Sequence, residues 1–159
     1  MELHPDKTRI VYCQDSNRRG SHEHTSFTFL GFTYRPRQAR RKDGKQFTSF
    51  LPAISKDALK KISAEVRSWR LHRWVSSEGR EIAKLINPKT RGWMAYYGAF
   101  YPSALYPVLR RINTYLMRWV MSKYKKRRTW KKATRALMDA AAIRPRYFAH
   151  WAWVKPAAR

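Results

Sequence analysis

Acidic residues are scarce in this sequence, and cysteine is nearly absent. Ten Asp and Glu residues stand against 35 Lys and Arg residues, which gives a formal charge of +25 over 159 residues. Between Glu81 and Asp139 there is no acidic residue at all. A solvated helical face normally mixes both signs, so this acid-free stretch predicts a surface kept positive for a polyanion. The single Cys13 excludes an internal disulfide and is typical of a reducing compartment.

The sequence also lacks the segments that attach proteins to membranes. It contains no apolar run long enough to cross a bilayer and no lipidation motif. Its first residues, Met1–Pro5, do not look like a signal peptide. The cations run from end to end instead of flanking one amphipathic helix, which favours nucleic acid over a membrane surface as the partner.

The residue patterns of common enzyme sites are missing as well. The carboxylates are scattered and never adjacent, whereas two-metal polymerases and nucleases cluster theirs around Mg²⁺. There is no Gly-rich phosphate loop and no Gly-x-Ser-x-Gly turn. Cys13 could join His4, His22 and His24 around zinc, but structural zinc sites usually pair their cysteines. We therefore expect no catalytic residue, no metal site and no cofactor bound by the protein itself.

Apolar residues make up 43% of the chain and aromatic residues 14%, which is too many for a disordered basic tail. Residues 26–34 alternate polar and aromatic side chains, a pattern that predicts a half-buried strand. We expect Gly31 to form a bulge or a close backbone approach in this strand, and Pro36 to end the strand. A basic loop with a turn at Asp43-Gly44 should follow, and then a short strand over residues 46–51.

From Ser55 onward, apolar residues recur every three or four positions, which predicts helices. Ser55 should cap the first helix and Thr129 the last one, and an aromatic tail should pack back on them. The helices are predicted near residues 56–75, 80–86, 87–100, 103–124 and 130–142. The predicted fold is α+β and mainly α, with strands and a basic loop over residues 1–52 and a helical bundle over residues 53–159.

Asn87-Pro88 is the sharpest local signal in the sequence, because Asn favours the N-cap position and Pro the first helical position. This places Lys89 and Arg91 in the first turn of a helix, where free backbone N–H groups bind anions. The aromatic residues that follow, Trp93, Tyr96 and Tyr97, either stack on unpaired bases or fill the bundle core.

Seven cations lie between Lys123 and Lys132, more than complementing a helix dipole requires, and this density indicates phosphate contact. The stretch Arg35–Lys45 is either an arm that enters a groove or a solvated loop. The residues expected to contact RNA are Lys60, Lys61, Arg67, Arg70, Lys89, Arg91, Trp93, Tyr97, Arg118, Lys123, Lys125, Lys126, Arg127, Arg128, Lys131 and Lys132.

Four separated blocks of the sequence resemble one protein family. Residues 87–98 resemble the maturase-specific motif of group II intron-encoded proteins, also called domain X or the thumb. Residues 3–13 resemble the late palm segment of their reverse transcriptases, and residues 27–32 resemble the last palm block. Residues 148–151 resemble the end of bacterial members. The blocks occur in the family's order over nearly the whole chain, so the resemblance is specific.

The resemblance implies a palm-edge remnant over residues 1–52 and an RNA-binding maturase domain over residues 53–159. Its partner would be structured group II intron RNA, whose folding and splicing it assists and which carries the Mg²⁺. The fingers, the paired-aspartate palm motif and an HNH endonuclease are absent from the sequence. We therefore expect no reverse transcription by this chain alone. A separate reverse-transcriptase fragment could complete the palm, and the expected location is the bacterial cytoplasm, on RNA or the nucleoid.

Two alternatives remain open from the sequence. The chain could be a nonfunctional truncated fragment that binds any polyanion. It could also be a basic DNA-binding protein, although an obvious helix-turn-helix pattern is missing.

Overall fold

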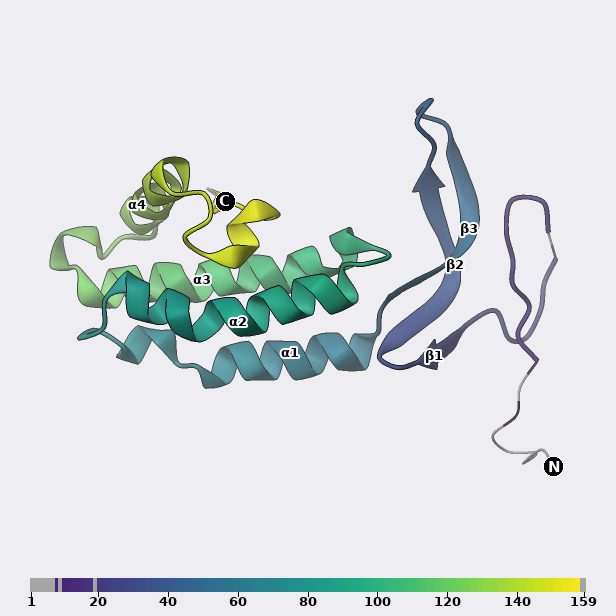
Figure 1. Cartoon of the computed structure of the whole chain (residues 1–159), viewed down its shortest axis with the longest axis horizontal. Helices are drawn as coiled ribbons and strands as arrows, with labels where there is room; N and C mark the ends of the chain where they lie inside the picture. Colours follow the sequence, from purple (N-terminus) through teal and green to yellow (C-terminus); the bar gives the residue numbers. More distant parts are fainter. Residues whose placement is uncertain (1–7, 9, 19, 158–159) are drawn as a thin grey trace. The chain divides into compact units, whose positions relative to one another are not determined.

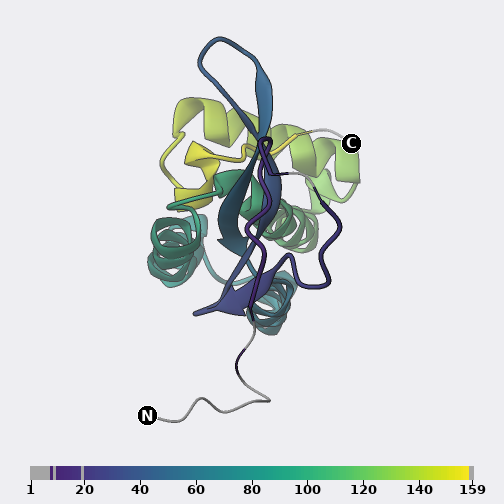
Figure 2. The ribbon, with the colours of Figure 1, turned by 90° about the vertical axis from the view of Figure 1, so that its right-hand side faces the viewer.

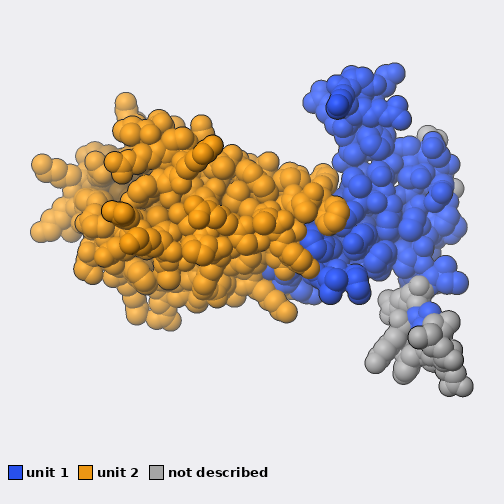
Figure 3. All heavy atoms as spheres, viewed as in Figure 1, with its two compact units in different colours: residues 1–58 blue, residues 59–159 orange. Residues whose placement is uncertain are grey.

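The computed structural model describes residues 8, 10–18 and 20–157 and divides the chain into two compact units, Met1–Ala58 and Leu59–Arg159 (Figure 3). The strands come first, and the helices follow (Figure 1). The fold is therefore α+β and mainly helical, as the sequence predicts. The elements are β1 (Phe27–Phe29), β2 (Phe32–Arg40), β3 (Gln46–Ile54), α1 (Lys56–Ser68), α2 (Gly79–Tyr97), α3 (Tyr106–Lys123) and α4 (Trp130–Ile143).

The first unit contains a three-stranded antiparallel sheet in the order β1-β2-β3. A two-residue turn joins β1 to β2, and both of its residues, Leu30 and Gly31, have positive φ angles of 48° and 80°. Positive φ at both central residues matches the right-handed twist of a hairpin. The predicted bulge at Gly31 is therefore wrong, because the chain reverses there and the alternating pattern belongs to two paired strands.

Strand β2 continues through Pro36, which lies opposite Phe50 of β3. Strand β1 pairs only with Phe32–Tyr34, so beyond Tyr34 one edge of β2 has no neighbouring strand among the described residues. A proline is tolerated at such an edge, where its missing N–H breaks no ladder bond. The prediction that Pro36 ends the strand is wrong, and half of the expected basic loop is strand. The predicted turn at Asp43-Gly44 is confirmed, with φ 87° at Gly44.

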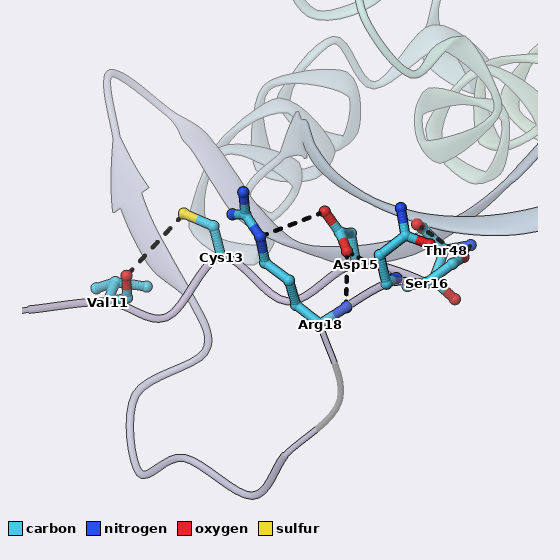
Figure 4. A network of polar contacts seen from close by, with 7 residues as sticks. Val11, Cys13, Asp15, Ser16, Arg18 and Thr48 are labelled. Carbon is cyan, nitrogen blue, oxygen red and sulfur yellow. Dashed lines mark hydrogen bonds and ion pairs between the residues drawn. The ribbon is translucent and has the colours of Figure 1, made fainter.

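The residues before β1 are attached to β3 by hydrogen bonds (Figure 4). The Ser16 hydroxyl accepts from the Thr48 amide at 2.7 Å, and the Ser16 amide donates to the Thr48 carbonyl at 3.1 Å. Asp15 Oδ1 accepts from the amides of Asn17 and Arg18, which closes a tight turn. Residues 3–7 and 9 of the palm-like block lie outside the described residues.

The second unit holds the helical bundle. Helices α1, α2 and α3 run side by side, and α4 crosses them (Figures 1 and 2). The predicted caps are confirmed, because Ser55 Oγ accepts from the Ala58 amide and Thr129 Oγ1 accepts from the Lys132 amide. Buried aliphatic side chains from all four helices form the core: Ile62, Val66, Ile82, Ile86, Leu109, Ile112, Leu116 and Leu137.

Helix α2 runs unbroken from Gly79 to Tyr97, so the predicted helix start at Asn87-Pro88 is wrong. The helix begins with a capping box in which Glu81 accepts from the Glu78 amide at 2.9 Å. Pro88 lies inside the helix and removes one backbone hydrogen bond. Buried residues lie on both sides of it along the same helix, Ile86 before it and Thr90 after it. Packing against the core thus keeps the helix continuous where the local sequence favours a break.

Asn87 is used for tertiary contact instead of capping. Its Nδ2 donates to the Tyr147 carbonyl at 3.0 Å, and its Oδ1 accepts from the Ala149 amide at 2.8 Å. Both partners belong to the segment that follows α4. One amide side chain therefore fastens this segment to the middle of α2.

Asn113 of α3 fastens the next turn of the same segment. Its Oδ1 accepts from Trp151 Nε1 at 2.9 Å and from His150 Nε2 at 2.7 Å, while its Nδ2 donates to the Val154 carbonyl at 3.1 Å. His150 and Trp151 are buried, with 0% and 1% of their surface exposed. The predicted packing of the aromatic tail on the helices is confirmed.

Replacing Asn113 by Ala should strongly destabilise the protein. The change leaves two buried donors and one carbonyl without partners, so the free energy of unfolding should fall by roughly 2–4 kcal/mol. Urea denaturation measures this loss. In the control Thr114→Ala, the deleted hydroxyl bonds only a carbonyl of its own helix, and the change should stay within about 0.5 kcal/mol. Equal effects of the two variants would contradict the role given to Asn113.

Burial lowers the pKa of His150 from 6.5 to about 3, so the folded state keeps this ring neutral. The unfolded chain takes up the proton near its ordinary pKa, so the unfolded state binds more protons below pH 6.5. The contribution of His150 to the free energy of unfolding is therefore fully present above pH 6.5. It is lost as the pH falls toward 3, by at most about 1.4 kcal/mol per pH unit.

His150→Gln should flatten this part of the pH dependence while it keeps an N–H donor for Asn113. The measurement is the free energy of unfolding by urea at pH 7, 6 and 5 for both proteins. Parallel pH profiles would show that His150 is not buried in its neutral form.

Candidate nucleic-acid interface

The acid-free stretch, residues 82–138, covers most of α2, all of α3 and more than half of α4. All of its Lys and Arg residues are exposed except Lys123, which is half-buried. Most of its aliphatic residues are buried in the core instead. The amphipathic patterning of these helices therefore places positive charge on the solvent side of the second unit, with no carboxylate from the same stretch to neutralise it.

The densest group of cations lies at the junction of α3 and α4, where Lys125–Arg127 forms a 3₁₀ turn. Six exposed side chains of this junction form no ion pair with a carboxylate in the part of the chain that the structure describes. Arg127 lies over the Tyr124 ring at 5.3 Å. We call these six residues the junction cluster: Lys125, Lys126, Arg127, Arg128, Lys131 and Lys132.

Lys123 differs from its neighbours because its ammonium group is already bound. Its Nζ donates to the Ser77 carbonyl at 2.8 Å and to the Glu78 carboxylate at 2.6 Å. The hydrogen bond to Glu78 raises the pKa of Lys123. Only 12% of its side chain is exposed, so its geometry is that of a tie between α3 and the start of α2.

The cations of α1 and α2 that are predicted to contact RNA likewise include several that lie exposed and one that is already paired with a carboxylate. Lys60, Lys61, Arg67 and Arg70 are exposed, and Arg70 has a left-handed backbone with φ 46°. Lys89 forms an ion pair with Glu65, which joins α2 to α1, and the hydrogen bonds from Lys89 and Trp69 lower the pKa of Glu65.

Because α2 begins at Gly79, Lys89 and Arg91 lie in the middle of a helix and not at its N-terminus. The anion site expected from free N–H groups at a helix start does not exist there. Contact of these two side chains with RNA stays a prediction, as it does for Arg118, which lies exposed on α3 at 5.5 Å from the Tyr115 ring.

The three aromatic residues of the motif differ in exposure. Trp93 is half-buried and stacks on Trp69, with 5.8 Å between the ring centroids and 6° between the planes. Tyr96 is 49% exposed and meets the half-buried Tyr97 edge to face at 4.8 Å. Tyr96 therefore does not fill the core. For Trp93 and Tyr97, stacking on a base stays a prediction.

The structure contains a cationic groove that was not predicted from the sequence. Arg80, Lys84 and Arg91 of α2 line a depression together with Arg144, which follows α4, and no carboxylate lines it. In one continuous helix, the spacings of four and seven residues place the three α2 cations on one face. The predicted break at Asn87 hid this signal, because it assigned Arg80 and Lys84 to another helix.

No group of three His, Cys, Asp or Glu side chains is arranged to hold a metal ion among the described residues. None of the helices within the described ranges is both long and apolar enough to span a bilayer.

Residues 59–137 match the family model of the group II intron, maturase-specific domain. Residues 59–137 are therefore a maturase-specific domain. The match runs from α1 to Leu137 of α4 and so includes the whole of α2 and α3 and the junction cluster. No curated protein and no solved structure matched the chain. The resemblance found in the sequence is confirmed for this part of the chain.

A maturase-specific domain is associated with group II intron splicing and with group II intron RNA, and it is not the catalytic polymerase domain of such proteins. Most of the acid-free stretch, including α3 and the junction cluster, therefore lies in the part of the chain that matches a domain associated with group II intron RNA.

The junction cluster and Lys123 should respond differently to substitution. Replacing Lys125, Lys126, Arg127 and Arg128 by Ala should shallow the dependence of log affinity on log salt by roughly 0.7–0.9 for each phosphate that the variant no longer neutralises. Lys123→Ala should leave that slope unchanged and lower the melting temperature, because the ammonium group binds Ser77 and Glu78. RNA titrations at several salt concentrations and thermal melts measure both effects. If the salt dependence of the fourfold variant equals that of the wild type, the junction cluster is a solvated surface that contacts no phosphate.

Proposed function

We propose that this maturase-specific domain binds structured group II intron RNA through the exposed cations of α2, α3 and the junction cluster, and thereby assists the folding and splicing of the intron. The observation that carries the proposal is the acid-free stretch of residues 82–138, in which the six cations of the junction cluster have no carboxylate partner among the described residues. The chemistry of splicing belongs to the RNA and its Mg²⁺, and the protein contributes binding.

The physical basis is the repulsion between phosphates in a compact RNA. Cations fixed on a folded surface neutralise phosphates and release their condensed counterions, which favours the compact form that they contact. Structured RNA is recognised mainly by its shape, its phosphates and its unpaired bases. A rigid helical face with fixed cation positions suits this mode better than a flexible basic tail, because the positions select one arrangement of phosphates.

For the first unit, we propose a palm-edge remnant that a separate reverse-transcriptase fragment completes. Support comes from β1, a short strand whose residues Phe27 and Phe29 are 40% and 60% exposed. An edge strand with exposed apolar side chains favours pairing with a further strand. The proposed location is the bacterial cytoplasm, where intron RNA is made.

A second candidate function follows from the formal charge of +25, which is sufficient for binding any polyanion. In that case the chain is a nonfunctional fragment, and its affinity depends on the length and charge of the nucleic acid and not on its fold.

The experiment compares binding to a group II intron RNA with binding to a scrambled RNA of equal length, between 50 and 200 mM salt. Both affinities should fall by roughly 10³- to 10⁵-fold if six to ten phosphates are contacted. A preference for the intron should persist at 200 mM salt, because fixed cation positions fit one RNA shape. Equal affinities at 200 mM salt would favour the fragment interpretation and refute a maturase role.

A further inference from the structure

A cavity of about 380 Å³ opens on the second unit between α3, α4 and the segment that follows α4. Its α4 wall is aliphatic and includes Leu137, Ala140 and Ile143. Trp119, Phe148 and Trp151 lie deeper and are 5%, 2% and 1% exposed, so they belong to the core. Arg127 of the junction cluster lines this cavity, but the proposed RNA contacts give its apolar and aromatic walls no role.

Two tyrosines present the aromatic surface that a ligand can reach. Tyr124 and Tyr147 line the cavity and are half-buried, so part of each ring faces solvent. The ring of Tyr147 packs edge to face on Phe148 at 5.1 Å, and its main-chain carbonyl is held by Asn87. Tyr147 is thus fixed in orientation by its neighbours before any ligand arrives.

The charged residues of the cavity are two arginines and one glutamate. Glu78 is occupied, because its carboxylate accepts from Lys123 and from the first turn of α2. Arg127 and Arg144 are exposed and have no carboxylate partner among the described residues. Arg144 and Tyr147 also line the cationic groove of Arg80, Lys84 and Arg91, so the cavity and the groove share these two residues in their walls.

The volume of the cavity and the charge of its lining indicate which ligand it can hold. The volume lies near the lower end of the range for small-ligand cavities, which is suitable for a single planar ring system and too small for a helix. A purely apolar ligand would gain nothing from two arginines beside the opening, whereas a base attached to its phosphates matches aromatic walls next to guanidinium groups.

We propose that this cavity takes the base of one unpaired nucleotide of the bound RNA, with the flanking phosphates on Arg144 and Arg127. The inference rests on the proposed function and names the element of RNA structure that the domain reads. A bulged nucleotide is already unstacked, so its insertion loses little stacking in the RNA and gains contact with the tyrosine ring.

The test uses two RNA hairpins of identical sequence except for one bulged nucleotide. The wild-type chain should bind the bulged hairpin roughly 5- to 150-fold more tightly, the range that stacking of one base on an aromatic ring supports. A 2-aminopurine placed at the bulge should change its fluorescence on binding, because it moves from solvent into the cavity.

Variants of Tyr147 separate this role from a structural one. Tyr147→Phe keeps the ring and should keep the preference for the bulge. Tyr147→Leu keeps the backbone carbonyl for Asn87 and an apolar wall, and it should abolish the preference while binding of the paired hairpin persists. Tyr115→Leu, at a half-buried tyrosine outside the cavity, is the matched control and should behave as wild type.

Equal affinity of the wild-type chain for both hairpins would overturn the inference, and a surviving preference for intron RNA would show that the proposed function still stands. Loss of the preference in Tyr147→Phe, with its melting temperature unchanged, would also overturn it, because the ring alone should suffice. Sedimentation tests one other occupant of the cavity. If the wild-type chain sediments as a dimer and Ile143→Arg makes it a monomer, the cavity binds a second copy of the chain, and this too would overturn the inference.

Discussion

The helical unit depends on two buried or half-buried asparagine side chains that bind one segment of chain. Asn87 and Asn113 lie on different helices, and together they hold residues 147–154 against the bundle. A buried amide is stable only when its donors and acceptors are paired, so the arrangement specifies one position for the segment. That position sets the place of Tyr147 and Arg144, and with them one wall of the cavity and one side of the cationic groove.

Electrostatics imposes the second constraint on this domain. A chain with a formal charge of +25 repels itself, and two of its ten acidic residues join helices to one another. Glu65 joins α1 to α2 through Lys89, and Glu78 joins the start of α2 to the end of α3 through Lys123. The remaining cations on α2, α3 and the junction cluster face solvent, which leaves them for phosphates. Fold stability and the proposed RNA binding therefore use different members of the same set of lysines and arginines.

Much of the fold could be predicted from the sequence, because helices α1, α3 and α4 carry both an apolar stripe and a local start signal. The error on α2 occurred where tertiary contacts override local preference. Asn87-Pro88 has the ideal composition for a helix start, yet Asn87 binds a segment sixty residues away and core packing carries α2 through Pro88. The junction cluster could be found from charge density alone. The groove of Arg80 and Lys84 could not, since its formation requires the continuous helix and a partner from the end of α4.

A defined face of the helical unit is proposed to contact RNA, and crosslinking can locate that contact on the chain. The measurement is ultraviolet crosslinking of the full chain to a group II intron RNA, followed by peptide mapping. Crosslinks should concentrate in residues 80–97, 110–118 and 124–147, which carry the groove, the exposed cations of α3, the junction cluster and the cavity tyrosines. Crosslinks spread evenly over the chain, or confined to residues 1–58, would show that this face is not the RNA-binding surface.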